Sequence, residues 1–105
     1  MPIYNKLVRD NIPEILQEKG KEYVGRTAEN KEEFFDKLKE KLQEEVDEFF
    51  KSPSAEEIAD IQEVLDALAY SVGSDAAEVA TIKEEKAAHR GRFYTGYILW
   101  SVEDE

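Results

Sequence analysis

The chain has 105 residues, of which 41% are hydrophobic and 37% are charged, and this length fits one domain with a modest core. Its 14 basic and 25 acidic residues give a formal net charge of −11, which argues against a nucleic-acid polymer or an anionic membrane as partner. The absence of cysteine excludes disulfides, thiolate metal sites and thiol nucleophiles.

The amino-terminal part of the chain predicts one short helix. Residues 3–9 are an apolar and basic lead-in, and residues 11–20 follow with Asn11 as a candidate cap, a proline in the first turn and a terminal glycine. Residues 22–28 have the character of a brief strand.

Three longer helices are predicted from capping boxes, in which a polar cap residue precedes a glutamate by three positions. The pairs are Asn30 with Glu33, Ser54 with Glu57, and Asp75 with Glu78. The helices are expected to end near Phe50, Gly73 and Gly91. The aromatic and β-branched tail RFYTGYILW, residues 92–100, can pair with residues 22–28 as a small two-stranded β ribbon. The fold predicted for the chain is therefore mainly all-α, a helical bundle built on an antiparallel helix pair.

Two of the predicted long helices carry acids on the faces that they use for packing. At about 100° per residue, Glu45 falls inside the apolar arc of the first long helix, and Glu48 lies at its margin. Glu57 lies within the apolar stripe of the next helix, and Asp60 lies just beyond it. Because a short connection makes the two helices antiparallel neighbours, these four acids should converge near the connecting end.

Four carboxylates in a partly buried pocket repel one another, so either some of them take up protons or a cation neutralises them. Ligands that are all oxygen suit a hard cation such as Mg²⁺ or Mn²⁺. The alternative is that these are ordinary solvated helix acids. The same spacing recurs at Glu63 and Asp66, which face away from the stripe.

The acidic motifs carry a family resemblance. EEVDE (Glu44 to Glu48), followed by EIAD (Glu57 to Asp60), resembles the EExxE…ExxD signature of the MazG-like all-α nucleoside triphosphate pyrophosphohydrolases. The end blocks YNKLVRDNIPEIL and EEKAAHRGRFYTGYIL resemble those of the small phosphoribosyl-ATP-pyrophosphohydrolase-like proteins, so the resemblance covers most of the chain. The chain departs from these blocks at Asn11, where lysine is common, and at Arg92, where glycine is common.

This resemblance implies Mg²⁺-dependent hydrolysis of a nucleoside triphosphate or a phosphoribosyl-ATP-like substrate to a monophosphate and pyrophosphate, by a homodimer or homotetramer. The metal ligands that it implies are Glu45, Glu48, Glu57 and Asp60. Glu44 would bind or orient a water at the metal, so Glu44 and Glu45 are the catalytic candidates.

Basic residues at both ends of the chain are candidates for substrate binding through phosphate. They are Lys6 and Arg9 in the amino-terminal block, and Lys83, Lys86 and Arg90 on one face of the last helix. Basic residues also favour helix carboxyl ends through the helix dipole, which is the ordinary alternative for the second group. His89 is expected to be a surface or packing residue.

The aromatic residues point to self-association more than to base stacking. Tyr4, Phe93, Tyr94, Tyr97 and Trp100 exceed what a small monomer can easily bury, so most are expected in the core or in an oligomer interface. Two alternatives to the enzyme remain, a non-catalytic module that binds metal and nucleotide, and a purely structural acidic helical dimer. Without a long apolar stretch or a signal-peptide pattern, the chain is expected to be cytoplasmic and to have no membrane partner.

Overall fold

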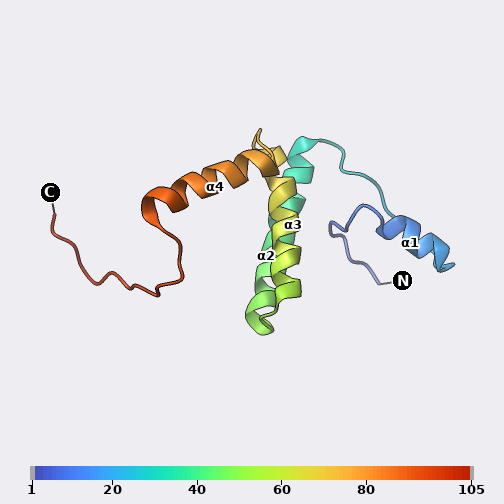
Figure 1. Ribbon diagram of the computed structural model, residues 1–105. Coiled ribbons are helices and arrows are strands. Elements are labelled where there is room, and N and C mark those ends of the chain that lie inside the picture. Colours follow the sequence, from blue (N-terminus) through green and yellow to red (C-terminus); the bar gives the residue numbers. More distant parts are fainter. Residues whose placement is uncertain (1, 105) are drawn as a thin grey trace.

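Four helices follow one another in the computed structural model, which describes residues 2–104, and no strand forms within that range. They are α1 (Ile12–Glu18), α2 (Lys31–Lys51), α3 (Ala55–Ser71) and α4 (Ala76–Arg90). Helices α2 and α3 form an antiparallel hairpin, and α1 and α4 extend to opposite sides of it (Figure 1). The predicted all-α class and the antiparallel helix pair are confirmed.

The start of each hairpin helix is set by its cap residue. The Asn30 side chain accepts a hydrogen bond from the backbone N–H of Glu33 at 2.8 Å, and the Ser54 hydroxyl accepts one from that of Glu57 at 3.2 Å. Each bond satisfies an N–H group that has no partner inside its helix. Pro53 lies in the connection and has no N–H to donate, which favours a break between the helices.

Helix α3 ends in a tight turn, and α4 begins a few residues later. Gly73 has a φ of 82°, and the N–H of Ser74 donates to the carbonyl of Ala69 at 2.8 Å. This 6→1 bond is the Schellman arrangement, in which glycine adopts the left-handed conformation without strain. Asp75 then caps α4 by accepting a hydrogen bond from the N–H of Glu78 at 2.8 Å.

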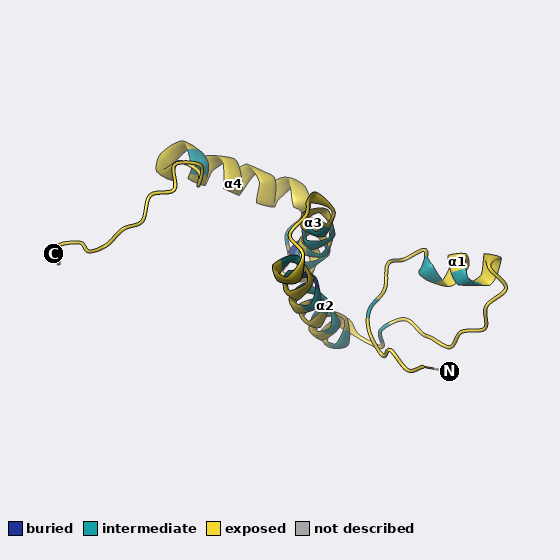
Figure 2. Cartoon of the chain, turned by 90° about the horizontal axis from the view of Figure 1, so that it is seen from below, coloured by how far each residue is buried: buried dark blue, intermediate teal, exposed yellow. Residues whose placement is uncertain are grey.

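The core of the described chain is confined to the interface between α2 and α3. Leu38 is 2% exposed and Ala69 is 6% exposed, and no other apolar residue between residues 2 and 104 is buried. Glu45 is buried to the same degree, at 6% exposure. Figure 2 shows buried and intermediate residues gathered on the hairpin, while α4 and both end segments are mostly exposed. A carboxylate is therefore one of the three most buried side chains of the hairpin.

The predicted β ribbon is wrong. Residues 22–28 lie on the side of the hairpin where α1 lies. Residues 92–100 follow the far end of α4, which lies on the opposite side of the hairpin (Figure 1). An extended segment needs a neighbouring strand to satisfy its backbone groups, and the hairpin separates these two segments.

The predicted side-chain cap at Asn11 is also not formed. Asn11 has φ −92° and ψ 1°, and its side chain makes no capping hydrogen bond. A capping residue normally has an extended backbone, which brings its side-chain oxygen over the first turn. Asn11 lacks that backbone, so α1 begins without this bond.

None of the helices between residues 2 and 104 combines the length and the apolar character needed to cross a membrane.

A bidentate ion pair fastens the segment that precedes α2. The Arg26 guanidinium donates to both carboxylate oxygens of Glu33, at 2.7 and 3.0 Å, and the N–H of Glu29 adds a third bond at 2.9 Å. These hydrogen bonds, that from Arg26 foremost, lower the pKa of Glu33 to about 2.

This lowered pKa predicts a pH-dependent contribution to stability. The ionised Glu33 stabilises the fold fully above its ordinary pKa of 4.5, and that contribution is lost as the pH falls toward about 2. We expect Glu33→Gln to lower the melting temperature by a few degrees near neutral pH and the difference from wild type to shrink near pH 3. Glu32→Gln, in the same first turn, is the control and should show a smaller difference. An undiminished Glu33→Gln difference at low pH would count against this assignment.

Candidate metal centre

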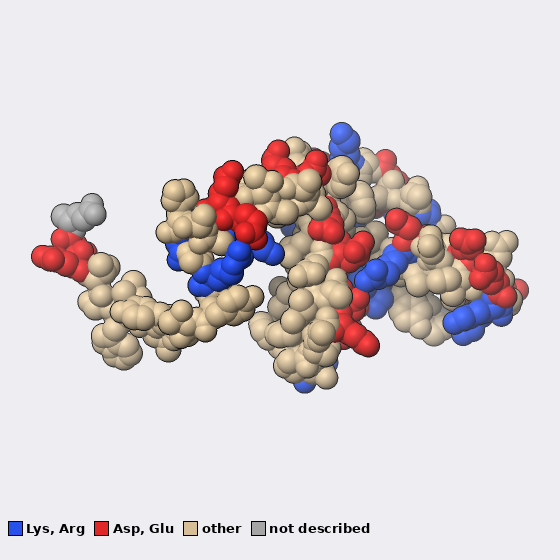
Figure 3. Space-filling model, viewed as in Figure 1, with Lys and Arg blue, Asp and Glu red and all other residues tan. Residues whose placement is uncertain are grey.

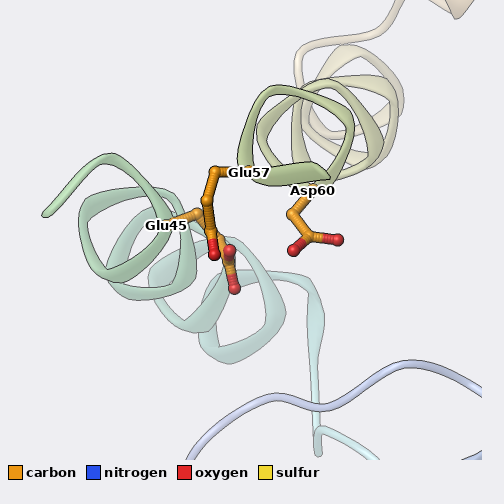
Figure 4. A group of neighbouring side chains, drawn as sticks. All are labelled: Glu45, Glu57 and Asp60. Carbon is orange, nitrogen blue, oxygen red and sulfur yellow. The ribbon is translucent and has the colours of Figure 1, made fainter. Parts of the chain in front are cut away.

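Three carboxylates from two helices meet at the hairpin interface. Glu45 comes from α2, Glu57 and Asp60 come from α3, and one oxygen from each lies within 4.8 Å of those from the other two. Figure 4 shows Glu45 and Glu57 reaching toward each other between the helices, with Asp60 beside them on α3. The structure thus brings together three of the four acids that the sequence suggests as metal ligands.

The local sequence explains why these acids point inward. Glu45 lies seven residues after Leu38 on α2, so it shares the face that packs against α3. Glu57 lies in the first turn of α3, where its N–H is held by the Ser54 cap. Asp60 follows Glu57 by three residues and is therefore its neighbour on the same helix surface.

Two carboxylate oxygens of this group are buried without a partner. Glu45 Oε2 and Glu57 Oε2 are inaccessible to solvent and accept no hydrogen bond from any described residue. Buried polar atoms in proteins are nearly always paired, because an unpaired one forfeits its bonds to water. Lys41 offsets part of the charge of Glu45. Glu48 is within hydrogen-bonding reach of Glu57. A proton shared between carboxyl groups or a bound cation would satisfy the two unpaired oxygens.

The surroundings of Glu57 oppose its ionisation. Loss of water around the carboxylate is the largest cause that raises the pKa of Glu57, followed by the charges of Glu48, Glu45 and Asp60. A divalent cation would reverse this effect, because it would replace repulsion among the carboxylates with attraction.

Glu48 and Glu44 lie at the edge of the three-carboxylate cluster. Glu48 is exposed and is not one of the three clustered acids, although it is close enough for its charge to raise the pKa of Glu57. Glu44 accepts a hydrogen bond from Lys6 at 2.9 Å, and this bond is the main cause that lowers the pKa of Glu44. The two acids lie on a shallow, open surface of α2 that is formed by Glu40, Gln43, Glu44, Asp47, Glu48 and Lys51.

The amino-terminal segment brings two of the predicted basic residues to these acids. Lys6 pairs with Glu44 at 2.9 Å, and Arg9 donates to Asp60 at 2.7 Å. Both contacts join residues far apart in sequence, so they place the lead-in of the chain against the acidic side of the hairpin.

The basic residues of α4 are not brought to the cluster. No ion pair within residues 2–104 joins Lys83, Lys86 or Arg90 to the acids of the hairpin, and α4 runs away from it (Figure 1). Figure 3 shows acidic side chains along the hairpin and a separate group of basic side chains near the far end of α4. His89 is exposed in the last turn of α4, as a surface residue would be.

Lys41, which was not predicted as a site residue, also lies beside the cluster. Its ammonium is 3.4 Å from Glu45 Oε1 and 3.5 Å from Glu44 Oε2, and its side chain is only 19% exposed. The signal was present, because Lys41 precedes these acids by three and four residues, the spacing of helix-surface pairs.

The donor set fits a hard divalent cation. All of the converging donors are carboxylate oxygens, which Mg²⁺, Mn²⁺ and Ca²⁺ prefer. Two oxygens on opposite sides of Mg²⁺ are about 4 Å apart, and about 5 Å apart around Ca²⁺. The observed limit of 4.8 Å is therefore within reach of small side-chain rotations.

Arg9 should weaken metal binding modestly, because its guanidinium occupies one oxygen of Asp60. We expect Arg9→Gln to increase Mg²⁺ affinity by less than about tenfold, since an exposed pair such as this one contributes up to about 1 kcal/mol. Calorimetric titration with Mg²⁺ measures the change. Lys19→Gln, at the end of α1, makes the same charge change and is the control. If both variants change affinity equally, Arg9 has no local effect on the site.

No family model, no curated protein and no solved structure was found to match this chain.

Proposed function

We propose that this chain is a Mg²⁺-dependent nucleotide pyrophosphohydrolase, which hydrolyses a nucleoside triphosphate or a phosphoribosyl-ATP-like substrate to a monophosphate and pyrophosphate. The observation that carries the proposal is the pair of buried, unpartnered oxygens on Glu45 and Glu57, next to Asp60. The resemblance of the EEVDE and EIAD segments to the MazG-like signature supports this reaction class.

In this proposal, Glu45, Glu57 and Asp60 hold the cation, and Mn²⁺ can replace Mg²⁺. Glu48 stands nearby on α2 and joins the ligand set by turning its side chain inward. The bound cation would shield phosphate charge, promote ionisation of a water and stabilise the leaving pyrophosphate.

Glu44 is suited to hold the attacking water. The carboxylate is ionised near neutral pH and can accept a hydrogen bond from that water, although the pKa lowered by the hydrogen bond from Lys6 makes it a weak general base. Lys6 and Lys41 restrain its position from two sides. Glu44 lies on the shallow, open surface of α2, so a substrate can approach it from solvent.

Lys6 and Arg9 are the basic residues best placed to contact substrate phosphate. Both lie beside the acids of the hairpin, and both are exposed enough to exchange a carboxylate partner for a phosphate. Magnesium commonly shares its ligand shell with substrate phosphates, so cations next to the cluster would meet the same substrate.

A nucleotide panel tests the proposal. Purified protein is incubated with standard and modified nucleoside triphosphates and with phosphoribosyl-ATP, with Mg²⁺ or Mn²⁺, and pyrophosphate and monophosphate are measured together. Release of both products in equal amounts is the expected result, and Asp60→Asn should abolish it. Asp66→Asn is the matched control, because Asp66 has the same spacing after a glutamate but is exposed. A complete absence of pyrophosphate across the panel would contradict the proposed activity.

The second candidate is a non-catalytic module that binds metal and nucleotide. It is favoured by the position of α4, whose basic residues lie away from the acids and so leave few cations to stabilise a transition state. Calorimetry that showed Mg²⁺-dependent nucleotide binding without product formation would select this function.

A further inference from the structure

The carboxyl-terminal segment of the described chain is apolar and exposed to an unusual extent. Among its residues Phe93 is 101% exposed, Tyr94 is 93% and Trp100 is 94%. The other large apolar residues there are Tyr97, Ile98, Leu99 and Val102, each at least 67% exposed. Soluble proteins rarely leave a contiguous run of this kind in water unless it is an interaction site.

The whole chain exposes far more surface than a compact monomer of its size. Its accessible surface is 9795 Å², whereas a compact monomer of this mass exposes roughly 6,000 Å². Its radius of gyration is 18.4 Å, against about 13 Å for a compact chain of this length. The excess of roughly 3,800 Å² is several times the ~800 Å² that each partner contributes to a stable interface.

Helix α3 offers an apolar surface that its own hairpin does not cover. Ile58 and Leu65 on α3, and Val72 at its C-cap, follow one another at intervals of seven residues and are 45%, 46% and 69% exposed. They lie beside the stripe that faces α2, so the apolar arc of α3 is wider than one neighbouring helix can bury. We call these three residues the α3 stripe.

Residues 93–102, which we call the tail from here on, do not reach the α3 stripe of their own chain. The tail leaves the end of α4 and runs away from the hairpin in both views (Figures 1 and 2). A second copy of the chain would supply the missing surface, because each tail could then cover the stripe of the other copy in a symmetric exchange. Two copies of the chain, each with a formal net charge of −11, repel one another. A contact through residues 93–102 adds no further repulsion, because these residues contain no charged side chain.

We propose that residues 93–102 bind a second copy of this chain, with the α3 stripe of that copy as the receiving surface. The exchange buries the tail of each chain and the exposed side of each hairpin together. It does not depend on the acids of the metal centre, so the catalytic proposal and this one can fail separately.

The mass of the protein in solution gives the first test. Size-exclusion chromatography with light scattering should give at least twice the chain mass of 12.1 kDa. Trp100→Ser and Leu65→Ser should each shift the protein toward the monomer on dilution, while Tyr23→Ser, which changes an exposed aromatic residue elsewhere, should not. A wild-type protein with the mass of one chain at micromolar concentration would overturn the proposal.

Disulfide trapping tests the pairing itself and does not require that the serine variants fold well. Because the chain has no cysteine, Val72→Cys and Leu99→Cys each introduce a single thiol. When the two variants are mixed and oxidised, a disulfide between residues 72 and 99 should join different chains. Lys19→Cys mixed with Leu99→Cys is the control and should form far less. If this disulfide forms only within one chain carrying both cysteines, the tail folds back on its own helix and the proposal is wrong.

Discussion

The Glu45→Gln variant should lose pyrophosphate release by at least about a hundredfold at saturating Mg²⁺. Glu45 is the most buried acid of the cluster, and one of its oxygens has no partner among the described residues. Glutamine keeps the size of the side chain but removes the negative charge that would hold the cation. Loss of an outer-shell partner alone typically reduces activity 10- to 100-fold, so loss of a direct ligand should reduce it at least as much.

Matched variants separate loss of the site from loss of the fold. Glu63→Gln removes an exposed acid from the outer side of α3 and should leave the rate within about twofold. Glu44→Gln should lower kcat while Mg²⁺ binding is retained, because Glu44 lies outside the three clustered acids. If Glu45→Gln keeps full activity and binds Mg²⁺ normally, Glu45 is not a ligand and the proposed site is wrong.

Magnesium should raise the melting temperature of the wild-type protein, and neutralising the two buried acids should abolish that response. A ligand at about 100 times its dissociation constant stabilises the folded state by about 2.7 kcal/mol. For a domain of this size, that corresponds to an increase on the order of 10 °C. The double variant Glu45→Gln/Glu57→Gln should melt higher than the wild type without metal, because it removes repulsion between buried carboxylates.

The pH dependence of this thermal shift follows from the raised pKa of Glu57. The unfolded chain ionises Glu57 more readily than the folded chain does, so in the metal-free protein this group is destabilising above its folded pKa. That penalty disappears as the pH falls below the ordinary value of 4.5. Protons and Mg²⁺ compete for the same oxygens, so the Mg²⁺-induced shift should shrink in acid. EDTA should reverse it, and an equal shift in the double variant would place the binding elsewhere.

Local chemistry allowed most of the hairpin to be predicted from the sequence. The caps at Asn30 and Ser54 depend on residues within one turn, and both form as expected. The inward direction of Glu45 and Glu57 follows from helical periodicity, which the packing of α2 on α3 preserves. These features need no knowledge of the rest of the chain.

Apart from the cap at Asn11, which is a local failure, the wrong predictions concern contacts between distant segments. The predicted ribbon required residues 22–28 to lie beside residues 92–100. Strand propensity is a property of each segment alone and does not predict whether two segments pair. The face shared by Lys83 and Lys86 was visible in the sequence, but the direction in which α4 leaves the hairpin was not. Glu48 lies between these two cases. Its position at the margin of the apolar stripe was predicted correctly, but its side chain is not one of the three clustered carboxylates.

The central claim is that α2 and α3 present a shared set of carboxylates to one divalent ion. Crystals soaked in Mn²⁺ and measured near the manganese absorption edge test it directly, because the anomalous signal locates the ion itself. We expect a peak bound by oxygens of Glu45, Glu57 and Asp60, and no such peak in Glu45→Gln/Glu57→Gln crystals. Manganese found only at other acids, with these three carboxylates unliganded, would contradict it.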